Sequence, residues 1–269
     1  MIRASPLARV ALYGFAFIVI YLAAVLTGVG QRLDAISLAT LEVLRMDPLT
    51  DLFAARSWIP IALIVAVGVL LVVALARRRR AAAFRAVCVV GLTYVVSQVL
   101  KDDLLGRPDL GDFSYDYNTY PSGHVAVSLA AAVAICWLLP RASGRALVIG
   151  LGGVTMCVAL FSVLSFAHRA SDVVGGALLA GMVGALINAV PSARGRGGER
   201  GVLWAPAIVA AGGASVMASA ATLLPWTTAD AVVTVLVEAA VLLGTAGAIS
   251  AVLVSEVGVS PRAPGSLRP

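Results

Sequence analysis

Long apolar runs dominate this chain of 269 residues and limit what it can fold into. Hydrophobic residues make up 60% of the sequence and charged residues only 13%, more apolar surface than one soluble core of this size can bury. A helix of about 20 apolar residues crosses the roughly 30 Å of hydrocarbon in a bilayer. Eight runs of suitable length lie near residues 10–29, 58–76, 82–100, 122–139, 146–167, 173–190, 202–224 and 231–254. The sequence therefore predicts an all-α fold, a polytopic transmembrane helix bundle.

The distribution of positive charge predicts the orientation of this bundle. With the N-terminus inside, fourteen of the twenty Lys and Arg residues fall on the cytoplasmic side. The run Arg77–Arg80 between two spans is such a topology signal and is attracted to anionic lipid, so we expect no nucleic-acid partner. The first span lacks a small-residue cleavage site and is expected to be retained. These features indicate a multi-pass protein of the cytoplasmic (inner or plasma) membrane.

The chain contains two histidines, and both lie at ends of predicted spans. One closes the segment Pro121-Ser122-Gly123-His124, where a span begins, and the other, His168, precedes Asp172 by four residues. Counting spans from the N-terminus brings both segments to the same membrane face, which is the outer one.

The segment that ends in His124 has the features of an anion site. The start of a helix presents unpaired N–H groups and the positive end of the helix dipole. Gly123 lets the backbone approach a ligand closely, and Ser122 can donate its hydroxyl. Lys101, the chain's only lysine, and Arg107 add positive charge from the preceding loop. We interpret these residues as a phosphate-binding site.

His168 and Asp172 supply reactive groups beside that site. A carboxylate bonded to one imidazole nitrogen fixes the tautomer and leaves the other nitrogen free to attack. His124 can protonate the leaving oxygen as a general acid. The pattern requires no metal ion and no cofactor.

These motifs resemble those of the type 2 phosphatidic acid phosphatase superfamily of membrane lipid phosphatases. The resemblance covers residues 1–190, the first six spans, and leaves two additional spans and a cytoplasmic tail in residues 191–269. It implies metal-independent hydrolysis through a phosphohistidine at His168, with Asp172 orienting that ring and His124 acting on the leaving group. The phosphate would be held by Lys101, Arg107, Ser122 and Gly123.

Two motifs depart from the family pattern. Five residues separate Lys101 from Arg107-Pro108 where the family usually has six, so an alternative alignment places Asp109 at the position of the usual arginine. The family's Ser-Arg pair before the second histidine reads Phe161-Ser162 here. Arg169 is our candidate for the missing phosphate-binding arginine. The other interpretation of Arg169 is a charged residue that solvates the loop or meets a lipid headgroup.

Four further features are expected to shape the structure. Residues 35–44 are predicted to form a short amphipathic helix at the membrane interface. The loop 101–121, which ends near Tyr120, is interpreted as facing the substrate. Gly175, Gly176 and Gly181 are predicted to allow close packing of the sixth span. Glu238, in the last span, is open to either a packing or a functional role.

The function predicted from the sequence is hydrolysis of a lipid phosphate at the outer membrane face. Suitable substrates are a polyprenyl (di)phosphate, phosphatidic acid or phosphatidylglycerol phosphate, and transfer to an acceptor other than water is a close variant. The alternative is a non-catalytic membrane protein that binds or transports phospholipids with a degenerate phosphatase site.

Overall fold

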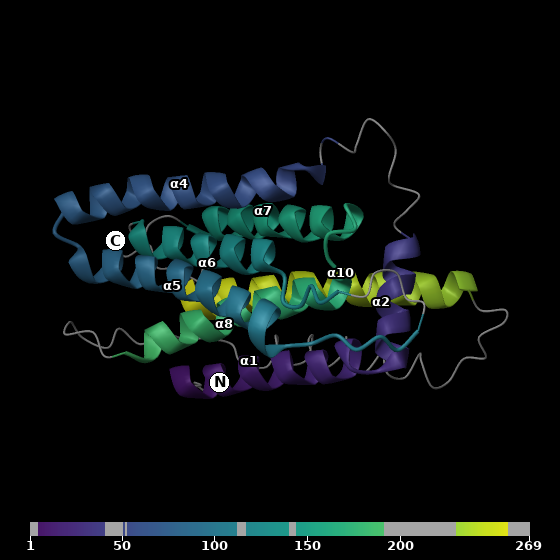
Figure 1. Ribbon diagram of the computed structural model, residues 1–269. Coiled ribbons are helices and arrows are strands. Elements are labelled where there is room, and N and C mark those ends of the chain that lie inside the picture. The colour runs from purple at the N-terminus through teal and green to yellow at the C-terminus, as the bar shows by residue number, and fades with distance from the viewer. Residues whose placement is uncertain are drawn as a thin grey trace, which may run out of the picture.

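The computed structural model describes residues 5–40, 51, 53–111, 117–139, 144–190 and 230–257. Regular structure in these residues is helical throughout, as predicted. The main helices run roughly side by side, and α2 lies across one end of the bundle (Figure 1). In chain order the elements are α1 (Pro6–Ile20) with the π-helical turn η1 (Tyr21–Val25), α2 (Gly28–Thr40), α4 (Ala55–Ala76), α5 (Arg80–Val99) with the π-helical turn η3 (Leu100–Leu104), α6 (Gly123–Leu138), α7 (Gly144–Leu164), α8 (Ala170–Ala189) and α10 (Asp230–Val257).

Several helices are long and apolar enough to cross a membrane. They are Pro6–Val25, Ala55–Ala76, Arg80–Leu104, Ala146–Leu164 and Ala170–Ala189. Large apolar side chains such as Phe15, Val72 and Phe84 are exposed on the outer helices, where lipid would cover them. These findings describe a multi-pass membrane protein. The predicted span 202–224 and the side chain of Glu238 lie outside the described residues.

Two helices form the centre of the bundle. Within its span, α8 is 83% buried, against 22% for α4. The short helix α6 is buried along most of its length. A Cβ atom on Gly181 of α8 would lie 2.6 Å from Val252 of α10 and 3.2 Å from the ring of Tyr13 on α1. The predicted packing role of this glycine is thus confirmed, because any larger residue would push these helices apart.

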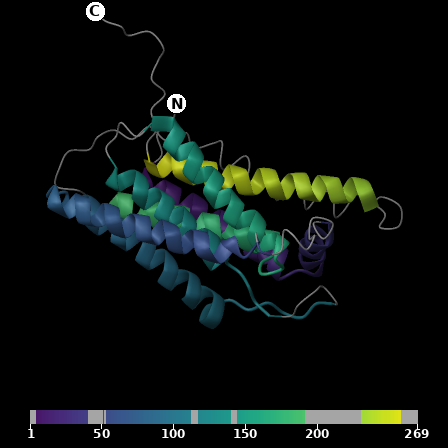
Figure 2. The ribbon, with the colours of Figure 1, turned by 90° about the horizontal axis from the view of Figure 1, so that it is seen from above.

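The last described helix belongs to the same bundle. α10 packs against α8, α7 and α6, and Figure 2 shows it at the edge opposite α5. The division of the chain at residue 190 remains a prediction.

The helix across the end of the bundle starts earlier than expected. α2 begins at Gly28 rather than near residue 35, and the predicted residues 41–44 lie outside the described ranges. Its buried side chains include Leu33 and Leu38, so α2 packs on the protein. Gln31 donates hydrogen bonds of 2.8 Å to the carbonyl oxygens of both Val25 and Pro108. α2 therefore ties the end of α1 to the loop that precedes α6.

Candidate active site

The turn between α7 and α8 carries His168. The carbonyl oxygen of Ser162 accepts hydrogen bonds from the backbone N–H groups of Ala167 (3.1 Å) and His168 (3.0 Å). Asp172, in the first turn of α8, accepts a 2.8 Å hydrogen bond from the backbone N–H of Arg169. An acidic residue that reaches back in this way stabilises a helix start. Local backbone bonds thus position both members of the His168–Asp172 pair.

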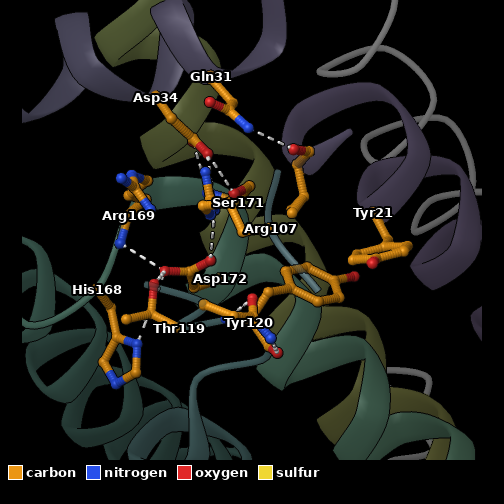
Figure 3. A network of polar contacts seen from close by, with 12 residues as sticks. Tyr21, Gln31, Asp34, Arg107, Thr119, Tyr120, His168, Arg169, Ser171 and Asp172 are labelled. Atoms are coloured by element: carbon orange, nitrogen blue, oxygen red, sulfur yellow. Dashed lines mark hydrogen bonds and ion pairs between the residues drawn. The ribbon is translucent and has the colours of Figure 1, made fainter. Parts of the chain in front are cut away.

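Asp172 is the centre of a buried polar network (Figure 3). Its Oδ2 accepts a hydrogen bond from the Thr119 hydroxyl, and its Oδ1 lies 3.3 Å from Nη2 of Arg107. The same Oδ2 is 3.8 Å from Nδ1 of His168. This distance exceeds a hydrogen bond, but catalytic contacts are often long before substrate binds. Asp172 is therefore within reach of His168 and also holds the loop before α6.

The segment before α6 is joined directly to the start of α8. The backbone N–H of Ser122 donates a 2.8 Å hydrogen bond to the carbonyl oxygen of Asp172. A Cβ atom on Gly176 would lie only 2.5 Å from the carbonyl oxygen of Ser122, and one on Gly175 would overlap the ring of Tyr120. These two glycines permit the close approach. Tyr120 itself is completely buried, so the interpretation of this part of the loop as substrate-facing is wrong for that side chain.

The hydroxyl of Ser122 is buried without a hydrogen-bond partner among the described residues. Serine at the N-cap of a helix normally accepts a hydrogen bond from the first turn, but the Ser122 side chain makes no capping bond. A buried polar group left in this state indicates a missing partner. A Cβ atom on Gly123 would meet Gln98 and Ser97 at ordinary distances of 3.4 and 3.6 Å. Packing does not require that glycine, whereas close approach of a ligand would.

The two histidines meet at this point. Their ring centroids are 5.8 Å apart and the ring planes are inclined by 69°. A group bound at the His168 ring is thus within reach of His124, as the counting of spans predicted.

Two basic residues between α5 and α6, Lys101 in η3 and Arg107 in the loop that follows, border the same region. Arg107 is buried, and its Nε and Nη1 atoms have no hydrogen-bond partner in the described part of the chain. Asp109 is exposed, so Arg107 is the residue that reaches Asp172. Lys101 is partly exposed and donates a 3.3 Å hydrogen bond to Oε1 of Gln98. This oxygen is also the atom that would lie closest to a Cβ atom added to Gly123. Both cations therefore lie near the start of α6 or α8.

Residues 82–196, which contain the histidines, match the sequence model described as the PAP2 superfamily. This part of the chain is therefore similar to the PAP2 superfamily. The similarity supports phosphatase chemistry in general and, with the apolar helices, a lipid-type substrate in a membrane. No curated protein and no solved structure matches the chain. The PAP2 segment runs from α5 through α8, whereas α1, α2, α4 and α10 lie outside it.

Arg169 lies within the PAP2 segment and is 1% exposed. A solvated loop residue is therefore the wrong interpretation of it. In Figure 3 its side chain extends on the Asp34 side of Asp172, away from the ring of His168. Its role as a phosphate ligand remains a prediction.

Arg56, outside the PAP2 segment, is a cation that the sequence analysis missed. It belongs to the first turns of α4, close to Phe53, whose ring centroid is 5.9 Å from that of Phe161. The start of α4 thus lies beside the Phe161-Ser162 pair. The Nε atom of Arg56 is buried and has no hydrogen-bond partner among the described residues. The positive charge of Arg56 is close enough to His124 for an electrostatic interaction with its ring. The sequence signal that could have identified Arg56 was a basic residue just before a predicted span.

Asp34 of α2 is the second residue missed. It is 1% exposed and accepts two hydrogen bonds from Ser171. Burial and the neighbouring Asp172 carboxylate raise the pKa of Asp34 to about 6. No motif in the sequence singles out this aspartate.

Proposed function

We propose that this protein is a membrane lipid phosphatase that hydrolyses a lipid phosphate or polyprenyl (di)phosphate through a phosphohistidine. The observation that carries the proposal is a surplus of buried hydrogen-bond donors beside the His168–Asp172 pair. The Ser122 hydroxyl and two guanidinium nitrogens of Arg107 have no partner among the described residues. A phosphate group offers oxygen acceptors for donors of this kind.

In the first step the Nε2 lone pair of His168 attacks phosphorus. The bond between phosphorus and the leaving oxygen breaks, and its electron pair remains on that oxygen. His124 donates a proton to the oxygen, so the lipid leaves as an alcohol, or as a monophosphate if the substrate is a diphosphate. Asp172 stabilises the positive charge that develops on the His168 ring.

In the second step water attacks the phosphohistidine. His124 accepts a proton from this water, the bond between phosphorus and Nε2 breaks, and inorganic phosphate leaves. His168 returns to its starting state. If an alcohol replaces water in this step, the same residues perform phosphotransfer.

The charge of the phosphoryl group is stabilised by side chains in this proposal. Lys101, Arg107 and Arg169 supply positive charge, while Ser122 and the backbone at Gly123 supply hydrogen-bond donors. Because these residues can neutralise a phosphate, the mechanism needs no divalent metal ion. Vanadate, which adopts the five-coordinate geometry of the transition state, should inhibit the reaction.

The substrate would be presented from the outer leaflet. The concentration of Lys and Arg in the predicted cytoplasmic segments supports an outward-facing site. Exposed apolar side chains on α1, α4 and α5 support a position of the acyl or prenyl chain of a substrate in lipid beside the bundle.

Phosphate release by the purified protein in detergent tests the proposal. The substrates are phosphatidic acid, a polyprenyl phosphate and a polyprenyl diphosphate, each measured with EDTA, and His168→Ala is the control. We expect turnover in EDTA that the control lacks. Dependence on added magnesium would overturn the metal-independent mechanism.

A second function is favoured by one observation, the presence of Ser162 where the family pattern has an arginine. With one cation fewer, the site would bind a phospholipid headgroup without hydrolysing it. Saturable binding of these lipids by wild-type protein without phosphate release would support this alternative.

A further inference from the structure

Asp34 reaches the candidate site from an element outside the PAP2 segment. It lies on α2, the helix across the end of the bundle, and Figure 3 shows its carboxylate directed toward Ser171 and Arg107. The side chain is buried completely. A buried carboxylate is costly unless hydrogen bonds and an opposite charge compensate it.

Its first partner is the residue directly before Asp172. Oδ1 of Asp34 accepts the backbone N–H of Ser171 at 3.1 Å, and Oδ2 accepts the Ser171 hydroxyl at 2.5 Å. Both oxygens therefore hold the first turn of α8, the turn that also carries Asp172. A shift of this turn would move Asp172 relative to His168.

Its second partner is Arg107. Oδ2 of Asp34 lies 3.8 Å from Nη2 of Arg107, the same nitrogen that lies 3.3 Å from Asp172 Oδ1. Arg107 is thus held at one nitrogen between two carboxylates, while Nε and Nη1 have no hydrogen-bond partner within the described residues. This arrangement fixes the guanidinium and leaves two donors available to a ligand.

We propose that Asp34 is a positioning residue of the phosphatase site, which orients Arg107 toward the substrate phosphate and holds the first turn of α8 through Ser171. The inference rests on the proposed function. Asp34 acts through these two residues and does not touch the phosphorus atom. α2 is then a part of the active site that the PAP2 segment does not contain.

A double-mutant cycle with Arg107 tests the inference. Asp34→Ala and Asp34→Asn are compared in wild-type and Arg107→Ala backgrounds, with Arg32→Gln, an exposed position on the same helix, as the control. We expect Asp34→Ala to raise KM for the lipid phosphate about tenfold, with a smaller fall in kcat, and to have little further effect once Arg107 is absent. Asp34→Asn should keep an oxygen for Ser171 and show a smaller KM effect.

The outcomes separate the two proposals. The inference is wrong if the wild-type protein releases phosphate and Asp34→Ala leaves KM unchanged. It is also wrong if Asp34→Ala raises KM by the same factor in the Arg107→Ala background as in the wild type, because Asp34 then does not act through Arg107. If the wild-type protein lacks turnover, the proposed hydrolysis is wrong. The same cycle is then measured by vanadate binding, where a tenfold weaker affinity that depends on Arg107 supports the positioning role and an unchanged affinity overturns it. If Asp34→Ala does not fold, the same comparison is made with Asp34→Asn alone.

Discussion

The two ends of the bundle each bury an arginine against a carboxylate, yet the two sites differ in what remains unpaired. At the end opposite the histidines, Nε of Arg9 lies 3.1 Å from Oε1 of Glu256 on α10. The other oxygen of Glu256 accepts a 2.6 Å hydrogen bond from Asn188. The indole of Trp137 donates to the backbone oxygen of Glu256. This cluster joins α1, α6, α8 and α10.

At the histidine end the carboxylates are also well bonded, but donors are left over. The Ser122 hydroxyl and two nitrogens of Arg107 lack hydrogen-bond partners among the described residues there. At the other end Nε of Arg9 makes no hydrogen bond to a described residue but lies in the ion pair with Glu256, and the Arg85 guanidinium lies 4.6 Å from the centre of the Trp137 ring. Donors that no carboxylate or ring compensates suit an anion. The comparison shows that a buried arginine–carboxylate pair does not by itself indicate function, and that the surrounding unsatisfied donors distinguish a ligand site from a structural contact.

The largest expected effect contrasts the buried His168–Asp172 pair at one end with the buried Glu256 at the other. His168→Ala should abolish turnover, because no other described residue is placed to accept the phosphoryl group. Asp172→Asn should leave residual activity, reduced by about 10⁴ in kcat if this pair behaves like a catalytic triad. Glu256→Gln should keep kcat within a few-fold while lowering the melting temperature in detergent. A large loss of kcat in Glu256→Gln, measured on folded protein, would contradict the division between the two ends.

The next effect concerns the arginines near the histidines. Arg169→Ala should lower kcat about 10²-fold or more, because one preorganised donor to the transition state is typically worth roughly 2.7–4 kcal/mol. Arg169→Lys should recover only part, since lysine lacks the bidentate fork. Adding Ser162→Arg to Arg169→Ala should restore some rate. If Arg169→Ala has a near-normal kcat and Arg56→Ala has the lowered kcat, the cation that stabilises the transition state is Arg56 of α4 instead.

A smaller effect is expected from a pair of serines on or beside α6. Ser122 and Ser128 both bury a hydroxyl without a partner among the described residues, but Ser122 lies at the start of the helix and Ser128 deeper in the bundle. Ser122→Ala should reduce kcat/KM about tenfold, through the loss of one hydrogen bond to phosphate worth about 1–2 kcal/mol. Ser128→Ala should leave it unchanged. Equal effects in steady-state kinetics would mean that the unpaired hydroxyl does not mark the ligand site.

The smallest effect is a pH dependence of stability. The pKa of Asp34 is raised from 3.8 to about 6, so the folded chain binds this proton more tightly than the unfolded chain. The contribution to stability is then full below about pH 4 and is lost as the pH rises through about 6. The melting temperature of the wild type relative to Asp34→Asn should therefore fall between pH 4 and 7. A difference that does not change with pH would show that Asp34 ionises normally.

Much of this arrangement follows from local sequence patterns. Apolar run lengths predicted the spans around α1, α4, α5, α7 and α8, and the four-residue spacing of His168 and Asp172 placed both at one helix start. The meeting of His124 with His168 followed from the direction of successive spans. Such features depend on lengths and spacings, which a sequence contains directly.

The sequence alone therefore determined that the chain is a helical membrane protein with its two histidines at one end. Only the tertiary structure decided which charges join them. Asp34 meets Ser171 across 137 positions of the chain, and Arg9 meets Glu256 across 247. Neither pair has a short, regular separation in the sequence that would predict the contact. The contacts arise from the packing of α2 across the bundle end and of α10 against α8. The compensation of a buried charge is a property of its three-dimensional surroundings, so the partners of Asp34, Arg107 and Glu256 became visible only when the helices were packed.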